Sequence, residues 1–316
     1  MGESMYLFKN KITLENREIL DKYLGSYEYK TSGLSFSSLY MWRNINYFSW
    51  EIFGDYLCIA GMSQLEEDKE EPFLLPPLTK TGFYEPEGLR NSILEAKRVF
   101  EECGFVCTLR LVPIQIMEAI KAAFPKEIHI IADRPNYDYL YLTKDLIELS
   151  GREFHSKRNH LNYFLNHYDY KYVALTSAMA GKAEQFIKEF NERKNLSGHE
   201  RELLLMEESA MKDVFHNIEK VGYHAGAILI DDKIEALSIG GNLGKRTVTV
   251  HIEKANIEFR GLYQAINNEF SKNVACRVKY INREEDMGIL GLRKAKLSYN
   301  PIKLVEKYIG VFKADL

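Results

Sequence analysis

The chain has 316 residues, of which 46% are hydrophobic and 28% charged, and its 42 Lys and Arg residues against 45 Asp and Glu give a formal net charge of −3. This composition excludes a disordered or collagen-like chain, because enough apolar surface is present to form a core. The near-neutral charge argues against nucleic-acid binding driven by bulk charge, although a local basic patch stays open. At about 150 residues per domain, the length predicts two domains.

Periodicity and turn signals in the first half predict two short helices, a hairpin, a strand, a long helix, a strand and another helix. These elements span residues 13–24, 35–43, 47–62, 73–78, 87–103, 105–112 and 114–123. The pair Gly54 and Asp55 suits the hairpin turn, Gly104 suits the end of the long helix, and Pro113 suits the first turn of the next helix. Two short strands at 127–131 and 137–142 follow.

The second half opens with a predicted helix at 150–168 and a strand at 170–175. Two helices, a hairpin, a strand, a helix, a strand, a helix and a closing segment follow at 177–193, 199–220, 223–240, 247–253, 259–272, 277–281, 284–294 and 301–308. From the hairpin onward, this order repeats that of the first half. A hairpin leading into strand–helix–strand predicts a mixed α/β sheet with helices on its faces. We therefore expect two tandem domains, 1–145 and 146–316.

The chain contains no apolar run of the roughly 18 residues that a membrane span needs, and its N-terminus lacks the layout of a signal peptide. These features predict a cytoplasmic protein without a transmembrane segment. The four cysteines, at 58, 103, 107 and 276, follow no zinc or redox spacing. The histidines at 155, 160 and 167 are not at a helical metal-binding spacing, so no metal site is predicted.

Two segments of the second half resemble a known family, namely GREFHSKRNH at 151–160 and NREEDMGILGLRKAK at 282–296. The chain resembles a bacterial family related to the C-terminal domain of phosphatidylglycerol lysyltransferase, which is similar in turn to the peptidoglycan-bridge aminoacyl transferases. The resemblance covers essentially the whole chain. It implies two acetyltransferase-like domains and transfer of an acyl or aminoacyl group to an amine or hydroxyl acceptor.

In the acetyltransferase-like fold, the last strand of the antiparallel group diverges from the strand after the helix, and the acyl donor lies in that gap. The resemblance therefore implies a gap between strands 247–253 and 277–281. The helix N-terminus at 259–262 would bind the phosphates of the donor. Arg260 and Gly261 are the donor-binding candidates there.

The phosphate loop departs from the acetyltransferase pattern at two positions. Ile257 stands where Gln or Arg is usual, and Tyr263 replaces a small residue, so that its ring would crowd a pyrophosphate. A coenzyme A thioester and an aminoacyl-tRNA both stay open as donor, and Tyr263 favours the latter. In the first half, Glu87 puts an acid at the corresponding helix start, which predicts that the first domain binds no such donor.

The helix at 150–168 carries a cationic, amide-rich stripe. His155, Arg158 and Asn159 share one face at helical spacing, and Lys157 belongs to the same basic motif. This stripe suits a phosphate or carboxylate, which Arg158 could bind bidentately, and an ordinary solvated basic face is the alternative. If Arg158 binds the donor, Arg158→Ala weakens that binding without unfolding the protein.

The segment 282–296 places acids at the start of its predicted helix and Arg293, Lys294 and Lys296 near its end. Plain helix-end electrostatics would explain this order. In the functional alternative, Asn282, Glu284 and Asp286 face the gap, and a carboxylate there accepts a proton from an attacking amine. Asn282, Arg293 and Lys294 then join the donor-binding candidates, and Glu284 and Asp286 are the catalytic ones.

His251 and Glu253 lie on one face of the predicted strand at 247–253, since they are two residues apart. Either could serve as a general base, and a structural role is the alternative. Two functions therefore stay open. The first is an acyl- or aminoacyltransferase acting by direct attack, and the second is a non-catalytic module of the same fold that recognises tRNA or an acyl ligand.

Overall fold

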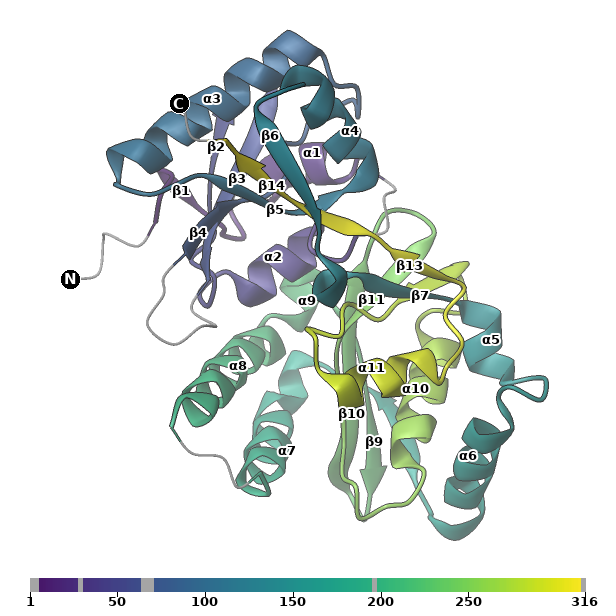
Figure 1. The fold of residues 1–316 in the computed structure, drawn as a ribbon. Helices are drawn as coiled ribbons and strands as arrows, with labels where there is room; N and C mark the ends of the chain where they lie inside the picture. The colour runs from purple at the N-terminus through teal and green to yellow at the C-terminus, as the bar shows by residue number, and fades with distance from the viewer. Residues whose placement is uncertain (1–5, 28–30, 64–70, 195–197, 314–316) are drawn as a thin grey trace. The chain divides into compact units, whose positions relative to one another are not determined.

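The computed structural model describes residues 6–27, 31–63, 71–194 and 198–313 (Figure 1). The chain divides into two compact units, Met1–Tyr137 with Val305–Leu316 and Asp138–Leu304. Each unit contains one seven-stranded mixed sheet with helices, which confirms the predicted mixed α/β class. Within the described residues, no helix combines the length and apolar character that crossing a membrane requires.

The sheet of the first unit has the order β1-β2-β3-β4-β5-β14-β6, and β4 and β5 are its parallel pair. Its strands are β1 (Asn10–Lys11), β2 (Ser49–Phe53), β3 (Tyr56–Ser63), β4 (Glu71–Leu74), β5 (Thr108–Pro113), β6 (Ile128–Ala132) and β14 (Lys307–Phe312). Its helices are α1 (Arg17–Leu24), α2 (Phe36–Trp42), α3 (Pro86–Glu102) and α4 (Ile114–Ala123), followed by the 3-10 turn η1 (Arg134–Asn136).

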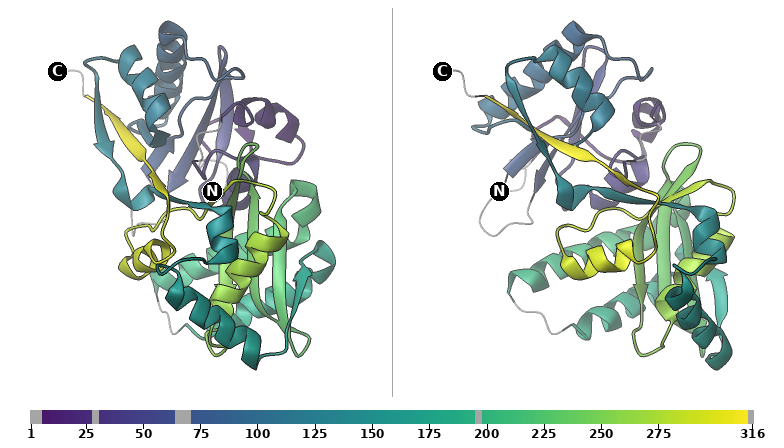
Figure 2. Two further views of the ribbon diagram at one scale, coloured as in Figure 1. Left: turned by 90° about the vertical axis from the view of Figure 1, so that its right-hand side faces the viewer. Right: turned by 45° about the vertical axis from the view of Figure 1, so that its right-hand side comes forward.

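The sheet of the second unit has the order β13-β7-β12-β11-β10-β9-β8, and β11 and β12 are parallel. Its strands are β7 (Asp138–Leu142), β8 (Lys171–Ala174), β9 (His224–Ile230), β10 (Lys233–Asn242), β11 (Thr247–Ala255), β12 (Tyr280–Asn282) and β13 (Lys303–Val305). Its helices are α5 (Thr143–Glu148), α6 (His155–His167), η2 (Ser177–Met179), α7 (Ala180–Glu192), α8 (His199–His216), α9 (Ile218–Val221), α10 (Leu262–Asn273) and α11 (Leu290–Leu297). Helix α10 lies on one side of this sheet and α7 on the other (Figure 2).

The two sheets share one plan, which confirms the repeated order of elements. Strands β1 to β5 occupy the same consecutive positions as β8 to β12, and the next position is held by β14 in the first sheet and β7 in the second. Strand β7 follows β6 in the sequence, yet it pairs with β12 through Leu142 and Tyr280. Strand β14 follows β13 and pairs with β5 and β6. The two units therefore exchange their corresponding strands.

This exchange changes the expected boundary. The predicted division into 1–145 and 146–316 assigned strand 137–142 to the first domain and the chain end to the second. In the structure, the second unit begins at Asp138 and the last segment, from Val305, belongs to the first unit. Strand pairing between residues more than a hundred positions apart leaves no local signal in the sequence, so the periodicity could not show it.

The core of the second unit lies between α10 and the sheet. Ala265, Ile266 and Phe270 of α10 are fully buried, and their spacing of one, four and five residues places them on one side of the helix. Tyr139 and Tyr141 of β7 are buried in the same cluster. The core thus fixes α10 against the strands that carry the predicted site residues.

Candidate functional site

Strands β11 and β12 lie side by side over only three residue pairs, which end at Thr249 and Asn282. Beyond this point β11 continues to Ala255 in contact with β10, whereas the chain after Asn282 turns away from β11 and stays bonded to β7. There the Arg283 N–H donates to the backbone oxygen of Tyr139, and the Glu284 oxygen accepts from the Tyr139 N–H. We call the region between residues 250–255 and 283–289 the β11–β12 divergence. It lies where the sequence placed the gap, at the carboxyl ends of two parallel strands.

His251 occupies an irregularity of β11 that turns its side chain toward this divergence. Ile239 of β10 pairs with Ile252 and the next residue, Gly240, pairs with Val250, so His251 is the extra residue of a β-bulge. The His251 imidazole is fully buried, and its Nδ1 lies 2.8 Å from Oε1 of Glu284, whose side chain is 16% exposed. These two sequence candidates therefore come together across the divergence.

The backbone of Glu284 is held in an uncommon conformation by Asn282. Glu284 has φ of +56°, and its N–H donates to Oδ1 of Asn282 at 2.7 Å. Nδ2 of Asn282 donates in turn to Oδ2 of Asp138 at 3.0 Å, and both side chains are fully buried. Asn282, expected as a donor-binding residue, therefore positions Glu284.

The protonation of Glu284 depends on burial and on its two basic neighbours. Burial raises the pKa of Glu284, while the hydrogen bond with His251 and the charge of Lys296 oppose that rise. The Lys296 ammonium donates to the backbone oxygens of Arg283, at 2.5 Å, and Glu285. Burial lowers the pKa of Lys296. A carboxyl whose pKa lies above its ordinary value, placed beside an imidazole, can accept and pass on a proton.

Glu253, the second base candidate on β11, is already occupied. Its Oε1 accepts from Nη2 of Arg283 at 2.7 Å, and its Oε2 accepts from Nδ2 of Asn267 at 2.9 Å. The Arg283 guanidinium also lies 4.8 Å from the ring centre of Tyr299 and 5.8 Å from that of Tyr141. Glu253 therefore anchors Arg283, and His251 and Glu284 are the base candidates that face each other across the divergence.

Asp286, expected as a catalytic carboxylate, is fully buried and surrounded by donors. It accepts from Arg293 Nε and Nη2, both at 2.9 Å, from the Tyr139 hydroxyl at 2.6 Å and from the Gly288 N–H at 2.9 Å. The predicted helix over 284–294 is wrong in its first part, because α11 begins only at Leu290. Positive φ angles at Glu284, Met287 and Gly288 break the helical path, and Asp286 holds the resulting loop.

The residues of the basic stripe on α6 make different contacts. The Arg158 Nη1 donates to the backbone oxygens of Leu149 and Gly151, the latter at 2.7 Å, so it secures the segment before α6. Asn159 and His155 contact each other at 3.4 Å on an exposed face. Lys157 instead lies 4.3 Å from the ring centre of Tyr299. Lys157 is the α6 candidate that reaches the side chains of the divergence.

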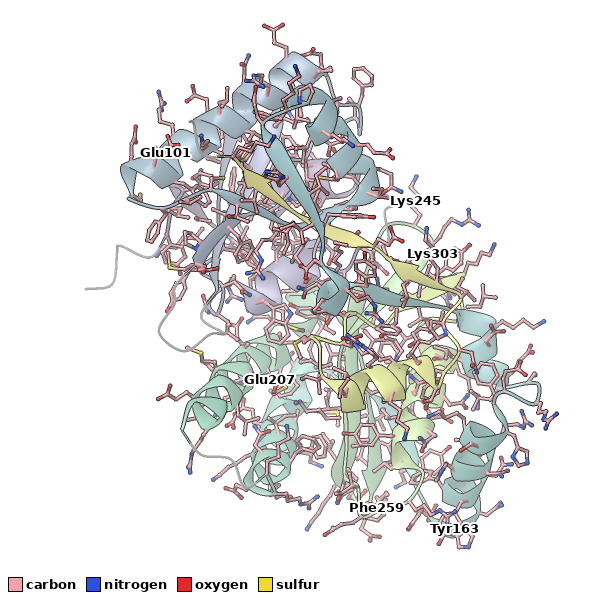
Figure 3. The ribbon with its side chains drawn as sticks, viewed as in Figure 1. Glu101, Tyr163, Glu207, Lys245, Phe259 and Lys303 are labelled. Atoms are coloured by element: carbon pink, nitrogen blue, oxygen red, sulfur yellow. The ribbon has the colours of Figure 1, made fainter. Side chains whose placement is uncertain are left out.

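The N-terminus of α10 is partly covered by α6. Gly261 has φ of +90°, and a Cβ added there would clash with the backbone oxygen of His160. Arg260 lies 4.4 Å from the ring centre of Tyr163, and Phe259 packs edge-on against Tyr168. Tyr163 and Phe259 lie at the same end of the second unit (Figure 3). Gly261 is thus required for helix packing, and Arg260 stacks on an aromatic ring.

Tyr263, in the first turn of α10, lies against the end of β11. Burial raises the pKa of Tyr263, and a hydrogen bond from the backbone of Ala255, at the end of β11, opposes that rise. In the first unit, the N-terminus of the corresponding helix α3 is capped by Glu85, whose carboxylate accepts from the N–H groups of Glu87 and Gly88. Lys294, the remaining donor-binding candidate, is exposed on α11.

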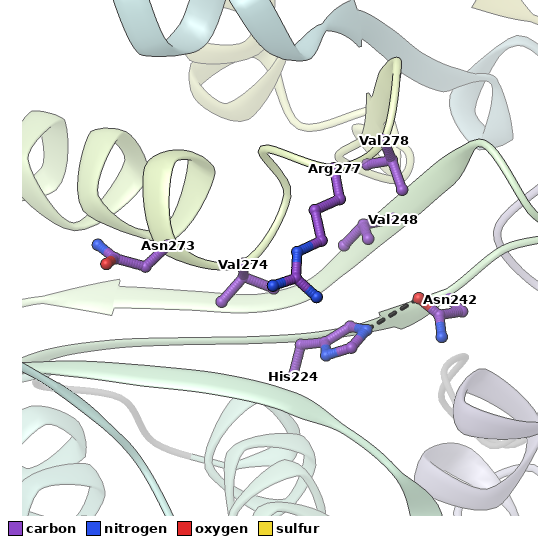
Figure 4. A pocket seen from close by; sticks show the side chains of 7 residues that line it. All are labelled: His224, Asn242, Val248, Asn273, Val274, Arg277 and Val278. Carbon is purple, nitrogen blue, oxygen red and sulfur yellow. Dashed lines mark hydrogen bonds between the residues drawn. The ribbon is translucent and has the colours of Figure 1, made fainter.

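A cavity of about 360 Å³ lies elsewhere in the second unit, near the start of β11. Arg277 and Val278, from the segment before β12, line it together with Val248. His224 and Asn242 also line it, and Nε2 of His224 donates to Oδ1 of Asn242 at 2.8 Å (Figure 4). None of the sequence candidates lines this cavity. Within the described parts of the chain, no group of three or more His, Cys, Asp or Glu side chains is placed to hold a metal ion.

The family model described as phosphatidylglycerol lysyltransferase, C-terminal, matches residues 25–310. The chain belongs to this family. The match includes both units and all residues of the β11–β12 divergence, so the His251–Glu284 pair lies within the part that this lysyltransferase family shares.

Several proteins are similar to the chain over long stretches. A crystal structure of a conserved protein of unknown function from Bacteroides thetaiotaomicron is 30% identical, has a TM-score of 0.86 and covers 98% of this chain and 100% of its own. The structure of L-PGS from Bacillus licheniformis has a TM-score of 0.64 at 10% identity, covering 98% of this chain and 95% of that one, which shows a shared fold. An uncharacterised protein of Mycoplasmoides gallisepticum is 26% identical over 196 residues, and the match spans 61% of its length.

Sequence reasoning missed two cations of the divergence as site residues. Arg283 directly follows Asn282, and Lys296 is the last residue of the same 282–296 motif. Both residues therefore belong to a motif that was already a candidate for the site. Their roles depend on which strand carries Glu253 and on where the loop turns back, and neither is a local property. Their position inside the motif was the only signal that could have pointed to them.

Proposed function

We propose that the second unit transfers an acyl or aminoacyl group from a donor ester to an amine acceptor at the β11–β12 divergence. The observation that carries this proposal is the His251–Glu284 pair, with its 2.8 Å contact across the divergence. Membership of the phosphatidylglycerol lysyltransferase family and the fold shared with L-PGS support transfer of an aminoacyl group in particular.

In the proposed reaction, the acceptor nitrogen attacks the carbonyl carbon of the donor, and a C–N bond forms as the ester C–O bond breaks. Glu284 accepts the proton that the nitrogen loses, and His251 shares it through Nδ1. The proton then returns to the oxygen of the leaving alcohol. No covalent enzyme intermediate is required, since the acceptor attacks the donor directly.

An aminoacyl-tRNA is the donor that we favour over a coenzyme A thioester. A pyrophosphate needs open backbone N–H groups at the start of α10. Helix α6 abuts Gly261 there, and Tyr263 lies against the end of β11. An ester donor that makes no contact with this helix start avoids both obstacles.

The acceptor can be a hydroxyl in place of an amine. A hydroxyl acceptor would lose its proton to the carboxylate of Glu284.

The test measures transfer of radiolabelled aminoacyl groups from a mixed aminoacyl-tRNA pool, and of acetyl groups from acetyl-coenzyme A, to a panel of amines and hydroxyl compounds. We expect transfer from aminoacyl-tRNA, reduced about 10²–10⁴-fold in Glu284→Gln and in His251→Gln, which is the usual contribution of a general base. Glu192→Gln, an exposed carboxylate on α7, is the matched control. Equal rates in all three variants would reject the role of the pair.

A non-catalytic binding module is the second candidate function. The ion pairs His251–Glu284 and Arg283–Glu253 both cross the divergence, and they would have to part for a donor to enter deeply. A thermal-shift measurement with acetyl-coenzyme A and, separately, with aminoacyl-tRNA separates the two. Stabilisation by aminoacyl-tRNA without transfer to any acceptor would favour the module, and no response to either donor would reject both functions.

A further inference from the structure

The side chains around Tyr299 form a cationic cluster that the proton transfer does not use. Lys157 Nζ and the Arg283 guanidinium lie 4.3 Å and 4.8 Å from the Tyr299 ring centre. They come from α6 and from the segment after β12, so two distant parts of the sequence converge on one ring. We call Lys157, Arg283 and Tyr299 the Tyr299 cluster.

The charge of this cluster is incompletely balanced. Glu253 is the carboxylate paired with Arg283, at 2.7 Å, and its second oxygen is taken by Asn267. Two cations therefore face one anion. Among the described residues, Glu253 is the carboxylate whose charge acts on the half-buried Lys157, and it is already paired with Arg283, so the cluster can accept an anionic ligand.

One nitrogen of Arg283 marks where such a ligand would bind. The Arg283 side chain is 13% exposed, and its Nη1 is buried without a hydrogen-bond partner among the described residues. Buried guanidinium nitrogens are normally satisfied, so an unsatisfied one is a feature that calls for a ligand or water. Lys157 is half-buried, so its side chain is partly accessible to solvent.

The geometry favours a phosphate over a carboxylate. A planar carboxylate binds arginine best through two parallel N–H···O bonds, but Nη2 is already committed to Glu253. A tetrahedral phosphate presents several diverging oxygens, so it can accept from Arg283 Nη1 and from Lys157 at the same time. In this arrangement the Tyr299 ring would pack against both cations. The phosphate would contact Lys157 and Arg283 on the sides that face away from the ring.

We propose that Lys157 and Arg283 Nη1, supported by Tyr299, form a subsite for the phosphate ester of a substrate. The inference rests on the proposed function in one respect, because it assigns the phosphate to the donor or acceptor of the transfer reaction. The subsite adjoins Glu284, since Arg283 and Glu284 are consecutive residues.

The protonation of Lys157 gives a direct readout of this subsite. Burial and the nearby Arg283 charge lower the pKa of Lys157, while Glu253 opposes this. Tyr299 and Tyr141 are the other titratable groups that face the cluster, and burial raises the pKa of both. An anion bound between the two cations stabilises the ammonium, so it raises the pKa of Lys157.

The experiment follows the full chain by NMR with ¹³Cε-labelled lysine and measures binding of inorganic phosphate, dimethyl phosphate and acetate at constant ionic strength. We expect inorganic phosphate to raise the Lys157 pKa and to bind at least tenfold more tightly than acetate. Lys157→Gln is expected to weaken phosphate binding at least tenfold, and Lys182→Gln, an exposed lysine on α7, is expected to change it less than twofold. Dimethyl phosphate binding as tightly as inorganic phosphate would identify a diester ligand and support the subsite.

Acetate binding as tightly as phosphate, or phosphate binding that Lys157→Gln leaves unchanged, would overturn the proposal. Arg283→Gln provides a second variant with the same expectation, and its thermal unfolding shows whether it is folded. If it does not fold, the Lys157 titration decides the matter. Phosphate binding in the absence of transfer activity would reject the proposed function alone, and transfer activity without phosphate binding would reject the subsite alone.

Discussion

Asp286 and Arg293 form a two-point ion pair that closes the loop between β12 and α11. Arg293 donates Nε and Nη2 to the two carboxylate oxygens, each at 2.9 Å, and Asp286 is fully buried. The sequence offered both residues as site candidates. Because four donors surround the carboxylate of Asp286, the pair fixes the loop that carries Glu284.

Asp286→Ala is therefore expected to destabilise the protein. The substitution removes the buried acceptor of the Tyr139 hydroxyl, of the Gly288 N–H and of Arg293, and leaving a buried donor unsatisfied costs about 1–3 kcal/mol. Urea unfolding measures this change. Asp169→Ala, at an exposed position between α6 and β8, serves as the control. A stability unchanged in Asp286→Ala, combined with loss of transfer, would return Asp286 to the catalytic group.

Gly261→Ala should disturb the contact between α6 and α10. The new methyl group would meet the backbone oxygen of His160, which cannot move without shifting α6, and the φ of +90° is unfavourable for alanine. We expect a loss of roughly 2 kcal/mol or more, because backbone strain of this kind costs about 1–3 kcal/mol before any clash. Chemical denaturation of the variant gives the value.

Gly181→Ala is the control for that measurement. Gly181 lies in α7 with no atom near the position of a Cβ, so alanine should stabilise the protein by about 0.4–1 kcal/mol. Equal effects of the two substitutions would show that Gly261 does not pack as described.

Arg158→Ala tests whether the basic stripe of α6 binds the donor. The sequence predicted weaker donor binding with no effect on folding. Since Nη1 of Arg158 donates to two backbone oxygens before α6, we now expect a loss of about 1–2 kcal/mol in unfolding free energy and an unchanged affinity for aminoacyl-tRNA. A tenfold weaker affinity at unchanged stability would restore the donor-binding role.

The stability of the protein should depend on pH through Glu284. Burial raises the pKa of Glu284 above its ordinary value of 4.5, so the folded state holds this proton more tightly than the unfolded chain does. The stabilisation from protonation is complete below pH 4.5 and is lost as the pH rises through the higher pKa of the folded state. The unfolding free energy of the wild type should therefore fall relative to that of Glu284→Gln between pH 4.5 and 8.

Parallel urea titrations of the two proteins across this range check the sign of the effect. A wild type that gains stability over Glu284→Gln as the pH rises would mean that the contacts with His251 and Lys296 outweigh burial. The transfer rate should rise over the same pH window, because the proposed base acts only in its ionised form.

Local patterns in the sequence determined much of the architecture. Hairpins, the strand–helix–strand order and the repeat depend on alternation, helical spacing and turn residues such as Gly104, all of which are properties of neighbouring residues. The expected position of the divergence was implied by the resemblance to the acetyltransferase-like fold, and His251 and Glu284 were both among the candidates.

Only the tertiary structure decided which candidates act together. Three features depend on pairings between distant segments. These are the exchange of β7 and β14, the contact of His251 with Glu284, and the hydrogen bond from Tyr139 to the buried Asp286. The sequence treats Glu284 and Asp286 alike, since they are two acids in one motif. The fold separates them, because a backbone turn at φ of +56° directs Glu284 across the divergence while Asp286 is enclosed by donors.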